Sequence, residues 1–427
     1  MKGFKIMPIT YKCASCGGIM EFDSASQKLK CLQCGNTKDI ETMETDNSMD
    51  ITANQEQENT VEMKLYHCKS CGAELVTDEF TAATICSFCG NPSLVGEQIQ
   101  GVYKPQRIIP FKMNKEEAQQ KYREWIKKGV LTPKELKDKA TIEKISGLYV
   151  PYWLYDYNAQ SQMTANAEIV NVKRKGEYEI TYHKEYHVYR DVTAEFKKVP
   201  ADASKNMEDN VMDKLEPFHY EELKPFAMEY MSGYLSERYS VTAEEMRPHV
   251  EKRIDKYITD ITKDTITGYS HVNVVSNHIN KVKKSVEYIM IPVWLLNCRY
   301  NSKDFQFMIN GQTGKIVADR PISMQKCILA AVSTFLLSLL LIMVGDALLF
   351  GKDVGFVQNM CDDILIKFII AIVVTALVIM LMLRSSRAHM TVGSSTYAGD
   401  NIRIGRREDT YIRTRKTERK IENNNEK

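Results

Sequence analysis

The first hundred residues contain no arginine, and the chain as a whole has almost no net charge. Residues 1–100 hold eight lysines against fourteen Asp and Glu, and the formal net charge of the 427-residue chain is +2. Nucleic-acid modules present a basic face to phosphate. The composition therefore gives no whole-chain argument for a nucleic-acid partner, and in the N-terminal region it favours protein recognition.

An apolar run of signal-peptide length is also missing before the first cysteine. We therefore expect the N-terminal region in the cytosol. Eight of the eleven cysteines fall into four Cys-x2-Cys pairs, and in a reducing compartment such pairs are more often metal ligands than disulfides. The three others, Cys298, Cys327 and Cys361, are predicted to be ordinary apolar residues.

A catalytic constellation is not apparent either. Residues 310–316 superficially resemble a phosphate-binding loop but lack its spacing, and strand-like runs on both sides favour a hairpin turn. His183, Glu185 and His187 share one face of a predicted strand, but strand residues four apart are separated by roughly 13 Å. We interpret that face as a polar sheet surface, and we expect a protein that is not an enzyme.

The sequence does contain two copies of a zinc-ribbon pattern. In each copy, two Cys-x2-Cys pairs are separated by fourteen residues, and every pair is followed by glycine, which tolerates the positive φ of a tight turn. Four thiolates complete the tetrahedral coordination of Zn²⁺, so each ion is expected to be structural. The predicted ligands of the two structural Zn²⁺ ions are Cys13, Cys16, Cys31 and Cys34 in the first ribbon and Cys68, Cys71, Cys86 and Cys89 in the second.

Short hairpins between the cysteine pairs place the ribbons at residues 1–41 and 63–98. The segment between them, residues 42–62, is polar, acidic and nearly free of large apolar residues, so a flexible linker is predicted.

An α+β middle domain with a weak internal repeat is predicted at residues 101–321. Each half carries a helix-capping pair followed by an apolar-periodic run, and each half ends in a strand with the motif Pro-x-Trp-Leu. The capping pairs are Asn114 with Glu117 and Thr242 with Glu245, and the motifs begin at Pro151 and Pro292. Segments of alternating polarity between the halves predict antiparallel strands. Together these patterns indicate a duplicated helix-plus-antiparallel-sheet domain.

Two apolar runs follow, at residues 327–344 and 364–383. At 1.5 Å per residue each is long enough to cross the hydrocarbon core of a bilayer, whereas two buried helices of a soluble domain are the alternative. Basic residues flank the pair and the connector 345–363 is rich in Asp, so the positive-inside rule places both termini in the cytoplasm and the loop outside the cell. We expect a multi-pass protein of the cell membrane.

The remaining residues, 384–427, are basic, with eleven Lys or Arg against six Asp or Glu. A solvated tail that obeys the positive-inside rule and a contact with anionic lipid fit this composition equally, and protein docking stays open.

This arrangement resembles the double zinc-ribbon membrane proteins of Gram-positive bacteria, often labelled TFIIB-type zinc-ribbon proteins. The matching stretches cover nearly the whole chain: Ile109–Lys112, Tyr149–Asp156, Glu222–Phe226, Pro292–Asn297 and Asn310–Lys315. The resemblance implies a non-enzymatic membrane adaptor that recruits an SPFH-domain (flotillin-like) partner and, through it, a PspA-type envelope-stress protein. Members are also often labelled replication-restart helicases, which the missing phosphate-binding loop and the acidic ribbons do not support.

The leading hypothesis is therefore a membrane-anchored scaffold whose ribbons and middle domain present protein-docking surfaces. A membrane-tethered nucleic-acid binder is the second reading, and an enzyme hidden in the middle domain is the third.

Overall fold

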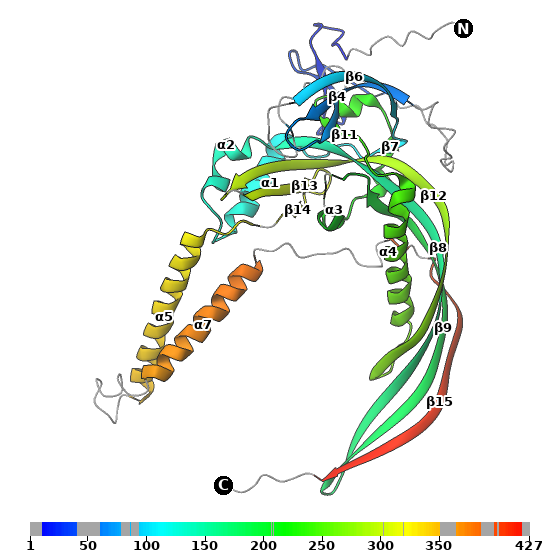
Figure 1. The fold of residues 1–427 in the computed structure, drawn as a ribbon, viewed down its shortest axis with the longest axis vertical. Helices are drawn as coiled ribbons and strands as arrows, with labels where there is room; N and C mark the ends of the chain where they lie inside the picture. The colour runs from blue at the N-terminus through cyan, green and yellow to red at the C-terminus, as the bar shows by residue number, and fades with distance from the viewer. Residues whose placement is uncertain are drawn as a thin grey trace.

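The computed structural model describes residues 11–40, 60–77, 86, 94–205, 207, 209–301, 303–318, 320–350, 364–385, 397–398 and 401–420. These residues form three parts (Figure 1). The body contains the described residues within 11–155, 197–242 and 286–322. The arm is a long curved sheet made of residues 156–196, 271–285 and 403–420, together with residues 243–270, which pack on it. The helix pair, residues 323–350 and 364–385, leaves the body on the side toward which the arm curves.

The strands in chain order are β1 (Met20–Asp23), β2 (Lys28–Cys31), β3 (Thr37–Lys38), β4 (Thr60–Cys68), β5 (Glu74–Thr77), β6 (Leu94–Tyr103), β7 (Arg107–Ile108), β8 (Ser146–Lys175), β9 (Tyr178–Asp202), β10 (Lys224–Pro225), β11 (Leu235–Glu237), β12 (His271–Tyr300), β13 (Lys303–Asn310), β14 (Ile316–Val317) and β15 (Arg403–Lys420). The helices are α1 (Lys115–Lys127), η1 (Glu135–Lys137), α2 (Lys139–Ile142), α3 (Asp209–Leu215), η2 (Tyr220–Glu222), η3 (Met228–Met231), α4 (Ala243–Asp264), α5 (Met324–Phe350) and α7 (Ile364–Ser385). The mixed α+β architecture is confirmed.

Twelve of the strands belong to one hydrogen-bonded sheet, and β1, β2 and β3 form a separate sheet in the first ribbon. In the arm the order is β12-β8-β9-β15, and all three pairings are antiparallel. In the body, β11 lies between β8 and β5, so the second ribbon joins the same sheet as the arm. The second ribbon is therefore not a separate module on a tether.

Helix α4 lies along the concave face of the arm (Figure 1). The Tyr155 hydroxyl donates to the Ala243 carbonyl at 2.6 Å, and the Asn277 amide donates to the Thr259 hydroxyl at 3.0 Å. Because side chains alternate across a strand, the apolar residues of β8 and β9 face α4 and the polar ones face outward. At its far end from the body, strand β12 begins opposite Glu168. Farther from the body than this pair, β8, β9 and β15 are the described strands that continue. We call residues 169–184 and 414–420 the tip.

The two halves of the middle domain make equivalent contacts. Both predicted capping boxes are present, at the starts of α1 and α4. The indole of Trp153 donates to the carbonyl of Val241, the residue before the cap of α4, at 2.9 Å. The indole of Trp294 donates to the carbonyl of Met113, the residue before the cap of α1, at 3.2 Å. Each Pro-x-Trp-Leu strand therefore holds the helix start of the other half.

The short parallel strands repeat this exchange. Strand β11 pairs with β8 at Leu148, three residues before Pro151, and β7 pairs with β12 at Ile289, three residues before Pro292. Each half thus adds its short strand to the long strand of the other half. The long strands themselves cross antiparallel, with Val150 opposite Ile291.

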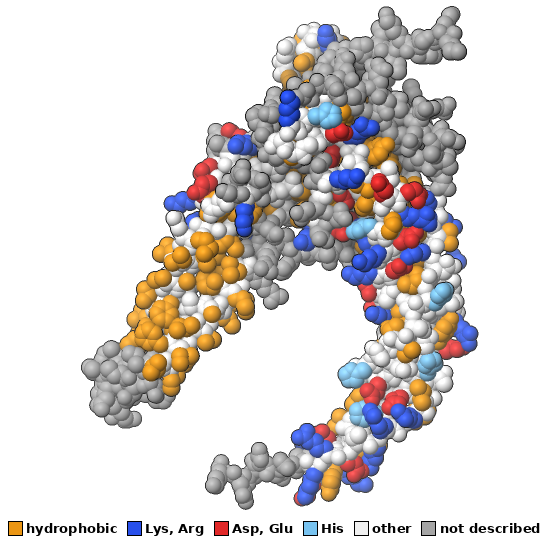
Figure 2. Space-filling view, in the orientation of Figure 1, with side chains coloured by type: hydrophobic (Ala, Val, Ile, Leu, Met, Phe, Trp, Pro, Cys, Tyr) orange, Lys and Arg blue, Asp and Glu red, His pale blue; other side chains and the backbone are white. Residues whose placement is uncertain are grey.

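The helix pair is distinguished from the arm by its surface (Figure 2). Side chains of α5 and α7 are mainly apolar and exposed, among them Leu329 at 69% and Leu365 at 74%, whereas the arm surface is charged and polar. The two helices run antiparallel and touch through Phe335 and Phe368, whose ring centroids lie 5.8 Å apart. Both are long and apolar enough to cross a membrane.

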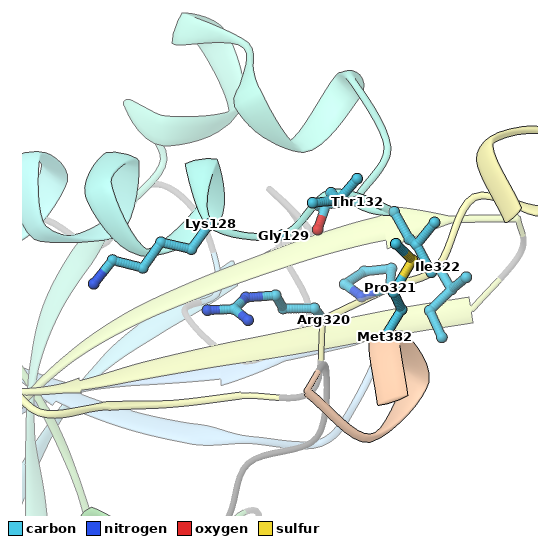
Figure 3. A pocket seen from close by; sticks show the side chains of 9 residues that line it. Lys128, Gly129, Thr132, Arg320, Pro321, Ile322 and Met382 are labelled. Atoms are coloured by element: carbon cyan, nitrogen blue, oxygen red, sulfur yellow. The ribbon is translucent and has the colours of Figure 1, made fainter. Parts of the chain in front are cut away.

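A pocket marks the joint between the helix pair and the body (Figure 3). It is lined by the loop after α1, by residues 320–322 and by Met382 of α7. The Arg320 guanidinium stacks on Trp125 at 4.2 Å, and the Ser323 amide donates to the Leu131 carbonyl at 2.9 Å. The start of α5 and the end of α7 are therefore both held at the same edge of the body.

Several predicted segments differ in extent. The strands predicted around residues 149–155 and 289–296 extend to 30 residues each in β8 and β12. Of the predicted linker, residues 60–62 belong to β4, and residues 42–59 lie outside the described part of the chain. Residues 403–420 of the predicted tail form β15, which pairs with β9 over its whole length. The sequence did not predict that pairing.

Candidate functional site

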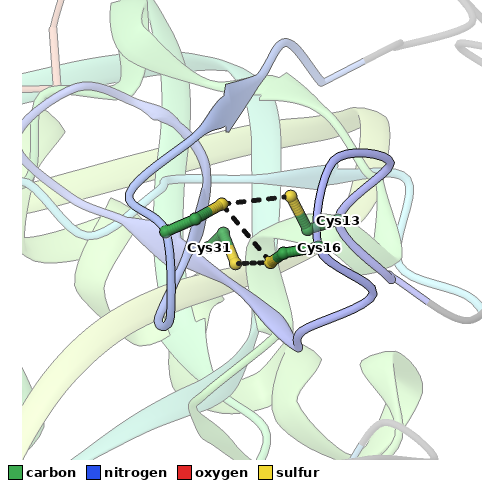
Figure 4. Close-up of side chains that lie close together, drawn as sticks. Cys13, Cys16 and Cys31 are labelled. Atoms are coloured by element: carbon green, nitrogen blue, oxygen red, sulfur yellow. Dashed lines mark hydrogen bonds between the residues drawn. The ribbon is translucent and has the colours of Figure 1, made fainter.

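The four cysteines of the first ribbon lie together (Figure 4). All four Sγ atoms are within 4.8 Å of one another. The Sγ of Cys16 is 3.5 Å from that of Cys31 and 3.4 Å from that of Cys34, and the Sγ of Cys13 is 3.5 Å from that of Cys34. This spacing fits four thiolates around one ion with Zn–S bonds of about 2.3 Å.

Two tight turns bring these sulfurs together. The Gly17 amide donates to the Cys13 carbonyl at 2.8 Å, and the Gly35 amide donates to the Cys31 carbonyl at 3.0 Å. Both glycines have positive φ, at 72° and 75°, a conformation that costs a residue with a Cβ roughly 1–2 kcal/mol. The predicted role of these glycines is confirmed.

The turns also favour the thiolate form that a metal requires. Hydrogen bonds from the backbone amides of Ser15 and Cys16 lower the pKa of the Cys13 thiol to about 6. The backbone amide of Cys34 lowers the pKa of Cys31 in the same way. Although the Gly18 amide lowers it, the neighbouring sulfurs of Cys34 and Cys31 raise the pKa of Cys16 to about 12. Because a thiolate is the ligand and a thiol is not, the turns favour the ligand form at Cys13 and Cys31. Four sulfurs would complete the coordination of one Zn²⁺ ion and would leave no position for a substrate.

The second cysteine cluster repeats this design. The Sγ atoms of Cys68, Cys71 and Cys86 lie within 4.8 Å of one another, and the Gly72 amide donates to the Cys68 carbonyl at 2.9 Å. Gly72 has a φ of 77°. The fourth predicted ligand, Cys89, lies outside the described residues. Two cysteine groups could therefore each hold a metal ion.

The first ribbon is packed firmly on the body. Phe22 is 4% exposed and meets Tyr230 edge-on at 5.3 Å. The Phe22 amide donates to the Ser232 carbonyl at 3.1 Å, and the Gln27 side chain donates to the Phe111 carbonyl at 2.8 Å. Burying one phenylalanine side chain stabilises this interface by about 2–3 kcal/mol.

The first ribbon also carries two exposed apolar side chains. Ile19 is 52% exposed and Leu32 is 66% exposed. They are neighbours, because the Leu32 amide donates to the Ile19 carbonyl at 3.2 Å. We call Ile19 and Leu32 the ribbon knob.

A buried ionic cluster joins the body to the chain that follows α7. Arg253 contacts both oxygens of Glu216, at 3.2 and 3.4 Å, and Asp213 at 3.1 Å. The Tyr397 hydroxyl donates to Glu216, and its ring stacks on Tyr257. Burial raises the pKa of Glu216 to about 7, against the opposing effect of Arg253. The sequence analysis missed this cluster, whose members are separated by up to 184 residues.

A second buried arginine secures β15. Arg190 is fully buried, and its guanidinium donates to both oxygens of Asp409, at 2.5 and 3.1 Å. Asp409 belongs to β15 and Arg190 to β9. A bidentate arginine–carboxylate pair is geometrically specific, so it fixes the register between these strands.

Two further features of the sequence can be placed in the structure. The segment 310–315 is the turn between β13 and β14, with Gly314 at a φ of 77°. The Asn310 side chain accepts from the Gln312 and Thr313 amides, both at 2.9 Å. His183 and His187 contact Glu168 and Asn166, respectively, on the adjacent strand β8. Both histidines are part of a polar sheet face.

The comparisons with known proteins give one informative relative. No family model matches the chain, and no solved structure matches it. The chain is 40% identical over 320 residues to the uncharacterized protein YdjG of Bacillus subtilis (strain 168), a match that covers 75% of this chain and 92% of YdjG. A similarity of this extent, together with cysteine clusters that fit zinc ribbons, shows that the chain belongs to the same family as YdjG.

Proposed function

We propose that the protein is a membrane-anchored zinc-ribbon adaptor that is not an enzyme. The observation that carries the proposal is the direct attachment of an exposed apolar helix pair to a body with two cysteine clusters, one of four sulfurs and one of three among the described residues. The clusters would hold two structural Zn²⁺ ions, and the helix pair would span the cell membrane. The zinc then supports a surface and leaves no position for a substrate.

The proposed topology places both termini in the cytoplasm and residues 351–363 outside. The joint supports it, because the start of α5 and the end of α7 lie at one edge of the body. The hydroxyls within the spans also find partners in their own helices, as Thr334 does with the Ala330 carbonyl at 2.7 Å and Thr375 with the Ala371 carbonyl at 2.7 Å. Such groups can therefore enter hydrocarbon without unpaired donors.

The proposed partner is an SPFH-domain (flotillin-like) protein and, through it, a PspA-type envelope-stress protein. We propose that the ribbon knob is one docking surface, because exposed neighbouring apolar residues on a rigid ribbon are typical of protein contacts. Anionic lipid is a further proposed partner of the basic residues in 384–427, alongside the cytosolic leaflet.

The test is to image the fluorescently labelled flotillin-like partner in cells that carry Ile19→Ser/Leu32→Ser. We expect membrane recruitment to fall several-fold. Removal of residues 1–98 is a poorer test, because Phe22, Leu75 and Val76 belong to the core of the body. The matched control is Val275→Ser, which changes an apolar residue of β12 that is 58% exposed. Unchanged recruitment in the Ile19→Ser/Leu32→Ser protein would sink the ribbon-docking proposal.

The second candidate is a membrane-tethered nucleic-acid binder, favoured by the basic composition of β15. A gel shift with oligonucleotides at increasing salt separates the two, since phosphate contacts weaken steeply with salt. A salt-sensitive shift abolished by substitutions in β15 would replace the adaptor proposal.

We also propose that the middle domain arose by duplication. The supporting observations are the two capping boxes, the exchanged tryptophan hydrogen bonds and the exchanged short strands. Alignment of residues 107–155 with residues 235–296 across many relatives tests it; relatives whose halves show no such correspondence would argue for convergence.

A further inference from the structure

Strand β15 forms an outer edge of the arm. All 18 of its residues are exposed, and among the described residues it pairs only with β9. Its other side therefore presents backbone donors and acceptors without a neighbouring strand in the described part of the chain. Such an edge is a template for a further strand.

Charge is sorted by strand on the outward face, the side of the arm sheet opposite α4. The register places eight residues of β15 on this face: Arg403, Arg406, Glu408, Thr410, Arg413, Arg415, Thr417 and Arg419. The acidic residues that β9 places on the same face are Glu179, Glu185, Asp191 and Glu195. Of the two outer strands, the edge strand β15 is thus mainly basic on this face, and its inner neighbour β9 is acidic.

The existing contacts show how β15 accepts an acidic neighbour. Arg413 donates to Glu185 across the two strands at 2.8 Å. Arg403, Arg415 and Arg419 form no ion pair within 4 Å among the residues described. These three arginines are available on the side where a further strand would lie.

We propose that β15 binds an extended acidic segment of a protein partner by strand addition. The inference rests on the proposed adaptor function and names the chemistry of one partner surface. A strand added about 4.8 Å from β15 would place every second side chain on the outward face. Glu or Asp at those positions would lie beside the arginine row, and opposite charges on neighbouring strands stabilise the pairing.

The charge pattern disfavours other occupants. Each copy of β15 carries eight Lys or Arg and three Asp or Glu, so pairing two copies would place mainly positive charges beside each other. Like charges on paired strands are destabilising. Nucleic acid lying across the outward face would meet the acidic row of β9. A single strand would also need aromatic platforms for its bases, whereas β15 presents none on this face.

The experiment measures binding of a fluorescent peptide of about twelve alternating Thr and Glu residues to the full chain in neutral detergent. We expect Arg415→Glu/Arg419→Glu to weaken binding about tenfold or more, because two favourable charge pairs become repulsive. The matched control is Lys252→Glu/Lys256→Glu on α4, which has the same charge change and spacing and should bind as the unmodified protein does.

A second peptide separates strand addition from charge alone. N-methylation of alternate residues keeps every carboxylate but removes the backbone donors of one edge, so we expect about tenfold weaker binding. Equal binding of both peptides would overturn the proposal, as would no effect of Arg415→Glu/Arg419→Glu. Tighter, arginine-dependent binding of oligothymidine or of phosphatidylserine vesicles would also overturn it. If the peptide did not bind but recruitment in cells still depended on the ribbon knob, this inference would be rejected and the proposed adaptor function would stand.

Discussion

The body and the arm share one continuous sheet but differ in what covers it. In the body, aromatic side chains fill a closed core, where Phe111 stacks on Tyr234 at 4.2 Å and meets Trp294 at 5.0 Å. In the arm, α4 covers the concave face, and no helix of the described residues covers the tip. Val172 and Tyr178 in the tip are 56% and 46% exposed.

The two parts therefore depend on apolar burial to different extents. The body is stabilised by burial of apolar surface and, in our proposal, by zinc. The arm is stabilised by a smaller apolar cluster that includes Met163, Val188 and Ile266, by ladder hydrogen bonds and by cross-strand side-chain pairs. Each such side-chain pair is worth roughly 0.2–1 kcal/mol. The uncovered tip, a single layer of sheet, is better suited to contacting a partner than to forming a core of its own.

Removal of zinc should produce the largest difference in stability between the body and the arm. Structural zinc contributes an apparent ~10–16 kcal/mol in zinc-finger peptides, so chelation should unfold residues 11–40 and leave the arm. Amide hydrogen exchange would show lost protection in the ribbon and retained protection in β8 and β9. Cys31→Ser should lower bound zinc from about two ions per chain to about one. Cys298→Ser is the control, and an unchanged ribbon after chelation would contradict the prediction.

Phe22→Ala tests how strongly the first ribbon is docked. Loss of a buried phenylalanine should lower the free energy of unfolding of the body by about 3–5 kcal/mol, measured by urea denaturation, without loss of zinc. Leu32→Ala changes an exposed residue of the same ribbon and should stay within about 0.5 kcal/mol. Similar effects of both substitutions would show that the ribbon is loosely attached.

Glu216→Gln probes the connection between the body and the chain after α7. The folded-state pKa of Glu216, about 7, is above its ordinary value of 4.5. Its contribution to stability is therefore complete below pH 4.5 and is lost as the pH rises through 7. Between pH 5.5 and 7.5 the stability of the unmodified protein should fall by about 2 kcal/mol relative to Glu216→Gln, measured by thermal unfolding.

Tyr397→Phe provides the control for that pH series. It removes the hydroxyl but keeps the carboxyl group, so the fall in stability with pH should persist. Parallel pH curves for the unmodified protein and Glu216→Gln would exclude Glu216 as the titrating group.

Asp409→Asn should have the smallest effect, confined to the arm. It leaves the buried Arg190 without its charged partner. Because the side chain of Asp409 is 28% exposed, we expect the free energy of unfolding to fall by about 1–2 kcal/mol. Hydrogen exchange of β15 should accelerate while the ribbons stay protected. Glu418→Gln removes an exposed carboxylate from the same strand and should change little; faster exchange in both variants would mean that general charge, and not the Arg190 pair, holds β15.

Local features of the fold were predictable from the sequence. Capping boxes, Cys-x2-Cys-Gly turns and long apolar runs depend on residues within a few positions of each other. The predictions for Asn114, Thr242, Gly17 and Gly35 are accordingly confirmed. Residues 310–315 were also recognisable as a turn, because their glycines lie between two strand-like runs.

The arm was not predictable, because its strands read as ordinary ones and β15 reads as a charged tail. A strand with both faces exposed shows no alternation of apolar and polar residues, and its partner β9 is more than 200 residues away in the sequence. The Glu216 cluster was not predictable for the same reason, because its acid, its arginine and its tyrosine come from three distant segments.

Spacing within a short window of the sequence encodes the cysteine clusters, the helix starts and the apolar helix pair. Long-range packing is what joins the second ribbon to the main sheet, fixes the first ribbon to the body through Phe22, and makes residues 403–420 an edge strand. Those outcomes depend on which surfaces and backbone edges meet after the chain folds back on itself, and local spacing carries no information about that.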